Sequence, residues 1–87
     1  MAKVFRKDFA HPASDAVSVT PNDSADLAIV SRALYVGGAG NVTVVMEDGE
    51  PGDTVVFSDV KSSTVLPIAV RRVMATGTTA TAIVALW

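Results

Sequence analysis

The feature that most limits the fold of this chain is an alternation of short β-prone runs with turn sequences from residue 27 to the last residue. Runs rich in Val, Ile, Thr and aromatic residues fit the pleated surface of a sheet. The expected strands are residues 16–20, 29–36, 42–47, 54–58, 65–74 and 81–87. No stretch has the 3.6-residue period of an amphipathic helix. We therefore predict an all-β fold, a small antiparallel β-sandwich or barrel of about six short strands.

The turn sequences lie at residues 37–41, 48–53, 61–63 and 75–79. The first of them, Gly37-Gly38-Ala39-Gly40-Asn41, superficially resembles a nucleotide-binding glycine loop. Such a loop opens directly into a helix, whereas here another β-run follows. We therefore expect a hairpin turn in which glycines adopt positive φ angles.

The chain divides into an extended N-terminal arm, residues 1–12, and a single β domain, residues 13–87. Residues 1–26 are polar and are interrupted by Pro12 and Pro21, with a turn-forming stretch at residues 21–26. A chain of 87 residues makes one domain with a thin core.

Apolar residues make up 49% of the chain and charged residues 18%, which is a high apolar share for a small domain. Alternation places one face of each strand inward, and we expect that face to hold Arg32, Leu34, Val36, Val42, Val44, Met46, Val56, Leu66, Ile68, Val70, Ile83, Ala85 and Trp87. The opposite face is apolar as well, with Val45, Val55, Ala69, Val73, Val84 and Leu86. A sheet that is apolar on both faces is expected to be covered twice, once by its partner sheet and once by another subunit.

Two adjacent arginines lie in the middle of an expected strand, so Arg71 and Arg72 must face opposite sides of the sheet. An arginine on the apolar side needs a carboxylate or carbonyl partner, which Asp59, Asp26 or a neighbouring subunit could supply. An intersubunit ion pair and an intramolecular pair both remain open. We predict a subunit interface formed by Tyr35, Arg71, Arg72, Val84, Leu86 and Trp87.

The residues argue against catalysis and against cofactors. The chain has no cysteine, and its only histidine, His11, has no second histidine or cysteine with which to bind a metal. No nucleophile lies in a pattern that supplies it with a base, so we predict no catalytic residue, no metal site and no cofactor. The acidic loop at residues 47–53 lacks the ligand order of an EF-hand, and a solvated loop tip is favoured over a calcium site.

The net charge of −2 and the five aromatic residues argue against nucleic acid as a partner. No stretch approaches the length of apolar sequence that spans a membrane, and the first residues lack the apolar core of a signal peptide. The cations are unevenly distributed, because Lys3, Arg6 and Lys7 lie within the first seven residues. This arm is either a solvated terminus or a basic segment that docks on an acidic surface.

Residues 13–27, 32–42 and 65–81 resemble a family of small virion proteins, the head spike base proteins of tailed phages and of phage-like gene transfer agents. The most distinctive stretches are RALYVGG, which begins at Arg32, and RRVMATGTTAT, which begins at Arg71. The resemblance covers residues 13–87. It implies a β-rich homo-oligomer, a pentamer or trimer, on the capsid surface of a virion assembled in the host cytoplasm.

The same resemblance implies two protein partners, the major capsid protein and a spike or fibre protein. A basic arm with Lys3, Phe5, Arg6, Lys7 and Phe9 suits docking on an acidic capsid patch. Two other functions stay open. One is a capsid decoration or cement protein that stabilises the shell, and the other is a small receptor- or glycan-binding β-module, for which Tyr35 and Trp87 are the residues to test.

Overall fold

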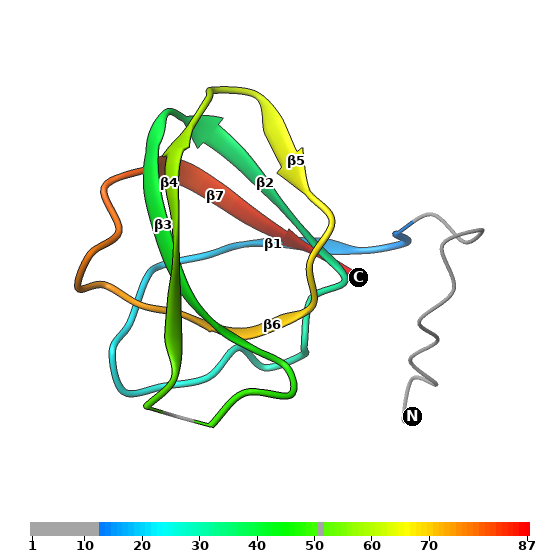
Figure 1. Ribbon diagram of the computed structural model, residues 1–87. Helices are drawn as coiled ribbons and strands as arrows, with labels where there is room; N and C mark the ends of the chain where they lie inside the picture. The colour runs from blue at the N-terminus through cyan, green and yellow to red at the C-terminus, as the bar shows by residue number, and fades with distance from the viewer. Residues whose placement is uncertain (1–12, 51) are drawn as a thin grey trace.

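The computed structural model describes residues 13–50 and 52–87, which fold into seven strands in two antiparallel sheets (Figure 1). The strands are β1 (Ala16–Ser18), β2 (Ala33–Gly38), β3 (Gly40–Met46), β4 (Thr54–Val60), β5 (Thr64–Leu66), β6 (Val70–Val73) and β7 (Thr81–Leu86). The described residues contain no helix. The predicted all-β class is therefore confirmed, in its sandwich form.

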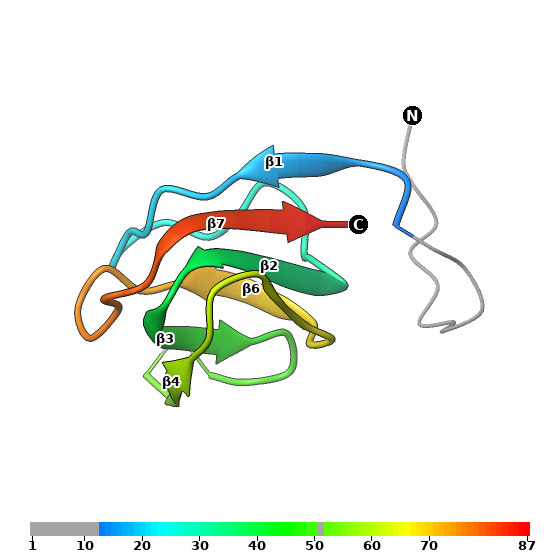
Figure 2. The same cartoon turned by 90° about the horizontal axis from the view of Figure 1, so that it is seen from above.

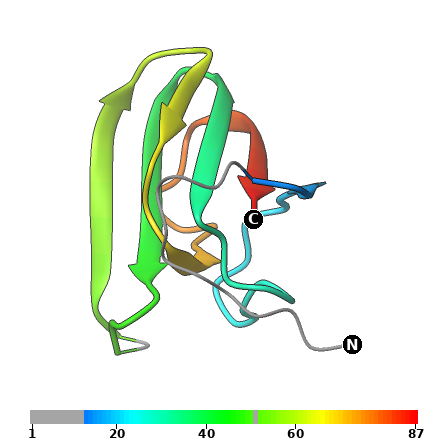
Figure 3. The ribbon, with the colours of Figure 1, turned by 90° about the vertical axis from the view of Figure 1, so that its right-hand side faces the viewer.

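Sheet A has the strand order β1-β7-β2-β5, and sheet B has the order β4-β3-β6. The two sheets lie face to face, with β1 and β4 on opposite sides of the molecule (Figures 2 and 3). Between them is a core of almost fully buried aliphatic side chains, namely Leu34, Val36, Val42, Val44, Val60, Val70, Val73, Ala80, Ile83 and Ala85. Burial of these apolar side chains is the main stabilising contribution available to such a small domain.

The glycine turn after β2 is a corner between the sheets, so the expected hairpin is wrong. Strand β2 belongs to sheet A and β3 to sheet B, and the two are not paired with each other. Gly40 has φ +154°, and a Cβ at this position would lie 2.6 Å from the backbone nitrogen of Ala80. The glycine is needed because the chain changes layers where another backbone segment passes close by.

The expected long strand at residues 65–74 is two strands in different sheets. Strand β5 pairs with β2 in sheet A, whereas β6 pairs with β3 in sheet B. Pro67 lies between them and cannot donate a ladder hydrogen bond. The chain turns here through a bond from the Ile68 nitrogen to the Leu66 carbonyl (2.9 Å), and crosses to the other layer.

Simple alternation gave the wrong face for two valines, Val56 and Val73. Val56 was expected to be buried, but its neighbour Phe57 packs on the core and Val56 is 51% exposed. Val73 was expected to face outward but belongs to the core, because a register shift between Val45 and Met46 interrupts the β3–β6 ladder. Val45 lies outside the core cluster, on the face opposite Val44 as expected, but it is fully buried there, and Arg72 is its partner across the ladder.

Candidate assembly surfaces

The outer face of sheet A gathers three of the residues predicted for a subunit interface. Tyr35 is the ladder partner of both Val84 and Val65, so the three side chains form one row across β7, β2 and β5. Leu86 lies on the same face two residues further along β7, opposite Ala33. None of these side chains is fully buried, and Val65 is 52% exposed. The face offers an apolar strip that could meet another protein.

Trp87 differs from the other predicted interface residues because it packs against the core. Its backbone is fixed beside β1: the Trp87 nitrogen donates to the Asp15 carbonyl (2.9 Å), and the Ser14 nitrogen donates to the Trp87 carbonyl (2.7 Å). Its indole Nε1 is buried without a hydrogen-bond partner among the described residues. The half-buried Trp87 side chain therefore packs within its own subunit, and its role in a subunit interface stays a prediction.

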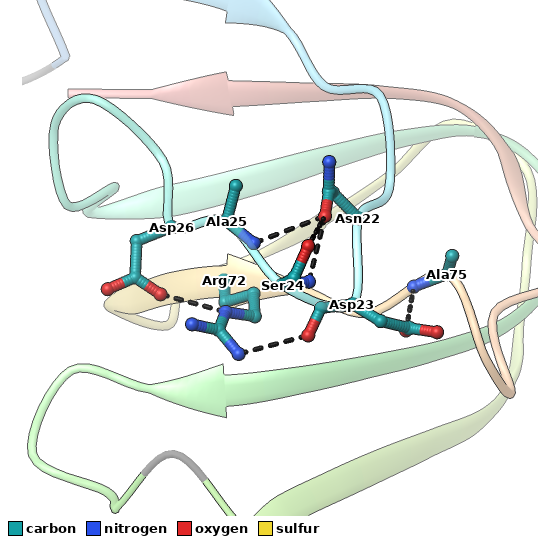
Figure 4. A network of polar contacts seen from close by, with 7 residues as sticks. All are labelled: Asn22, Asp23, Ser24, Ala25, Asp26, Arg72 and Ala75. Carbon is teal, nitrogen blue, oxygen red and sulfur yellow. Dashed lines mark hydrogen bonds and ion pairs between the residues drawn. The ribbon is translucent and has the colours of Figure 1, made fainter.

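The outer edge of β6 is closed by residues 22–27, which we call the clasp segment. The nitrogen of Asn22 donates to the Val73 carbonyl (2.9 Å), and the nitrogen of Leu27 donates to the Arg71 carbonyl (2.7 Å). The segment is a local turn, because Asn22 Oδ1 accepts hydrogen bonds from the backbone nitrogens of Ser24 (2.8 Å) and Ala25 (3.1 Å) (Figure 4). This turn occupies backbone groups that an edge strand would otherwise expose.

Arg72 joins the clasp segment to β6. Its Nε lies 2.8 Å from Asp26 Oδ1, and its Nη1 donates to the Asp23 carbonyl oxygen (3.1 Å) (Figure 4). Asp26 was one of the two acidic partners named from the sequence, so the structure provides the intramolecular pair. The Arg72 side chain is 16% exposed. A charge-assisted bond in such a position is stronger than one between fully solvated side chains.

Asp23 fixes the other end of the clasp segment to the turn after β6. Its Oδ1 accepts from the nitrogens of Ala75 (2.8 Å) and Thr76 (2.9 Å), and its Oδ2 accepts from the Thr76 hydroxyl (2.6 Å). Hydrogen bonds from the Thr76 side chain and backbone hold the pKa of Asp23 below its ordinary value. The sequence indicated a turn at residues 21–26 but gave no sign of this long-range contact.

Arg71 faces the other way, as adjacent strand residues must. Its backbone carbonyl accepts the bond from Leu27, and its Nε is buried without a hydrogen-bond partner among the described residues. Arg71 and Arg72 thus differ in their bonding, and Arg71 stays a predicted interface residue.

The outer edge of β4 is open. Strand β4 lies at the end of sheet B and is seven residues long, whereas the edge strands β1 and β5 of sheet A have three residues each. Val55 is 43% exposed and Val56 is 51% exposed, and they lie on opposite faces of the strand. A long edge with exposed valines on both faces is a template for pairing with another chain.

The acidic loop between β3 and β4 continues into this edge. Glu50 and Asp53 are exposed in the loop just before β4, and Asp59 is exposed near the end of the strand. Lys61 lies 3.8 Å from Asp59, with both side chains more than 80% exposed, so this pair is weak. In residues 13–50 and 52–87 no group of three acidic, histidine or cysteine side chains is placed to hold a metal ion.

Several predicted residues lie outside the part of the chain that the structure describes. These are the arm residues Lys3, Phe5, Arg6, Lys7 and Phe9, together with His11. No helix among the described residues is long and apolar enough to cross a membrane.

A solved structure decides the relationship of this chain to known proteins. The structure is described as the capsid of a native GTA particle computed with C5 symmetry, and one of its chains is 39% identical to this one. The match covers 92% of this chain and 89% of the other, with a TM-score of 0.79. This chain belongs to the same family as that capsid chain. The expectation of a virion protein of a phage or gene transfer agent is therefore confirmed, whereas the specific head spike base family is not shown by this match.

No protein-family model matches the chain, and neither does any curated protein. The family assignment therefore rests on the solved capsid structure. That structure supports a structural protein of the virion, and the finer assignments of spike base, decoration protein and oligomer are taken up as proposals.

Proposed function

We propose that this protein is an oligomeric, capsid-bound base that carries a spike or fibre on a phage-like particle. The observation that carries the proposal is the 39% identity, over nearly the whole of both chains, to a chain in the capsid of a GTA particle. A pentamer on a five-fold axis is compatible with the C5 symmetry in the description of that particle. Its partners would be the major capsid protein and a spike or fibre protein.

The surfaces described above support a role in assembly. The outer face of sheet A offers Tyr35, Val65, Val84 and Leu86, and the β4 edge offers Val55 and Val56. A protein with one apolar face and one unpaired strand edge suits a ring in which each subunit contacts two neighbours. Several subunits on one ring would bind the shell far more tightly than one, because their contacts act together.

Cryo-electron microscopy of particles from wild-type cells and from cells that lack the gene tests this function. We expect density at the five-fold vertices, with a fibre above it, that disappears when the gene is deleted. Density between capsomers at the three-fold positions would instead indicate a decoration or cement protein. Particles that do not change on deletion would contradict both functions.

A glycan-binding module is less well supported by the geometry. The sugar site would need exposed aromatic side chains, and of the two residues to test, Trp87 packs on the core and Tyr35 is half-buried. Glycan-array binding of the purified protein, lost on Tyr35→Ala, would favour this alternative.

A further inference from the structure

The open edge of β4 needs an occupant in the assembled particle. Natural sheets protect long edges with proline, lysine, a bulge or a covering segment. The clasp segment performs this task for β6, whereas the stretch from Thr54 to Ser58 contains neither proline nor lysine and no described residue pairs with its outer side. The edge is suited to strand addition, in which an extended segment pairs with the backbone and places alternate side chains against the two faces.

The charge of this edge indicates what would pair with it. Asp53 and Asp59 lie at the two ends of the exposed stretch, with Glu50 close by, and Lys61 is the nearby cation. An occupant with positive charge would therefore be favoured over a neutral or acidic one.

The chain itself contains a segment of this chemistry. Residues 3–9, with the sequence KVFRKDF, match residues 53–59 in length and combine three cations and one anion, Asp8, with Val4, Phe5 and Phe9, so the segment is net positive. In an extended conformation Lys3, Phe5, Lys7 and Phe9 would share one side, and Val4, Arg6 and Asp8 the other. The side with Lys3, Phe5, Lys7 and Phe9 carries two cations and no anion, so it is the better match for an edge that has Asp53 and Asp59 at its ends.

The position of the arm's attachment favours a neighbouring subunit over the same subunit. Ser14 and Asp15 are fixed beside the end of β7 by bonds to Trp87, at the β1 side of the molecule, and β4 lies at the opposite side (Figures 2 and 3). Only residues 10–12 separate residue 9 from the described domain, and they span at most roughly 14 Å. The molecule measures 33 × 27 × 18 Å, so this linker is too short to lead the arm across its own subunit.

We propose that residues 3–9 of one subunit add as a strand to the β4 edge of the next subunit. The contact is heterologous, since the donor and acceptor surfaces differ, and repetition of such a contact closes a ring. This inference rests on the proposed oligomer. It assigns the basic arm to the acidic edge of a neighbouring copy, in place of the capsid patch expected from the family resemblance.

Charge reversal tests the pairing in the full-length protein. One variant carries Lys3→Glu, Arg6→Glu and Lys7→Glu, and a second carries Asp53→Lys and Asp59→Lys. Native mass spectrometry is expected to show the oligomer for the wild type, monomers for each variant alone, and species that contain both variants when the two are combined. Both restored contacts join unlike variants, so an odd-numbered ring keeps one mismatched contact, and mixed dimers or open mixed chains already count as rescue. An oligomer that survives the arm reversal unchanged would overturn this inference while leaving the proposed function intact. A monomeric wild type would overturn the proposed oligomer as well.

Cysteine cross-linking tests the location, because the natural chain has no cysteine. Full-length protein with Phe5→Cys and Val56→Cys is treated with a short bismaleimide and is expected to give a ladder of covalent multimers. The matched control is Phe5→Cys with Ile29→Cys, because Ile29 is also exposed (38%, against 51% for Val56) and lies outside both surfaces described above. Equal cross-linking in both proteins, or multimers in the control alone, would overturn the assignment to β4.

Discussion

Strands β6 and β4 flank the same central strand, β3, yet their outer edges differ. The clasp segment pairs with β6 through backbone bonds and through the Arg72–Asp26 contact, whereas the outer edge of β4 has no partner among the described residues. The charged side chains differ in the same way, since Arg72 is 16% exposed and Lys61 beside β4 is 81% exposed. One edge contributes to the stability of the subunit, and the other is available for contacts between subunits.

The largest expected effect comes from removing the Arg72 side chain, which helps to hold the clasp segment on the outer edge of β6. Arg72→Ala removes the bonds to Asp26 and to the Asp23 carbonyl and truncates the side chain paired across the ladder with the buried Val45, so we expect a loss of about 2 kcal/mol in the free energy of unfolding, measured by urea titration. Lys61→Ala is the matched control at the open edge and should change stability by less than about 0.5 kcal/mol. Equal losses in the free energy of unfolding for the two substitutions would show that the two edges contribute equally to the stability of the subunit.

A second expected effect concerns the bend at the end of β4. Asp59 has φ +58°, in the left-handed region, and its nitrogen donates to Asn41 Oδ1 (2.9 Å). Asp59→Val should cost about 1 kcal/mol because a β-branched residue is strained in this conformation. Asp59→Asn tolerates the conformation and removes the charge, so it should remain close to the wild type. A cost that is equal for Val and Asn would show that charge, and not backbone strain, determines the effect.

The contribution of Asp23 to stability should depend on pH, and this effect should be smaller than the two above. Because the folded pKa of Asp23 is depressed below 3.8, its contribution to stability is present above that value and is lost as the pH falls through the folded pKa. The Tm of the wild type should therefore fall in acid more steeply than that of Asp23→Asn, which keeps an acceptor for the Ala75 and Thr76 nitrogens. Amide resonances of Ala75 and Thr76 should follow the same titration by NMR. Parallel acid profiles for both proteins would contradict the role of Asp23.

Much of the fold could be predicted from the sequence because it depends on local patterns. The alternation of valines in β3 and the apolar end of the chain identified buried residues such as Val42, Val44, Ile83 and Ala85 correctly. The all-β class followed from the same pattern. These are properties of single strands, and they do not depend on which strands pair.

The predictions that were wrong concern features that depend on which strands pair and in which register. A glycine-rich turn between two β-runs is compatible with a hairpin and with a corner between layers, and only the crowding of Gly40 against Ala80 distinguishes them. The burial of Val73 follows from a register shift, which period-two alternation cannot predict.

The same limit applies to the candidate surfaces. The sequence named Asp26 as a possible partner of Arg72, but the contacts of Asp23 with Ala75 and Thr76 join residues more than fifty positions apart. Such contacts depend on how the layers are connected. The open edge of β4 was missed because Val56 was expected to be buried, and an edge strand can be recognised only from the strand order.

The smallest expected effect is at the open edge itself. Val56→Thr keeps the β-branched shape of a half-exposed side chain, so it should change the free energy of unfolding by less than about 0.5 kcal/mol. The measurement needs the dissociated subunit at low protein concentration, because a subunit contact would add to the apparent stability. Val44→Thr, on the adjacent strand, places a hydroxyl in the core and should cost at least about 1 kcal/mol. If Val56→Thr were as costly as Val44→Thr in the isolated subunit, the β4 edge would be part of the subunit's own packing and could not serve as a contact between subunits.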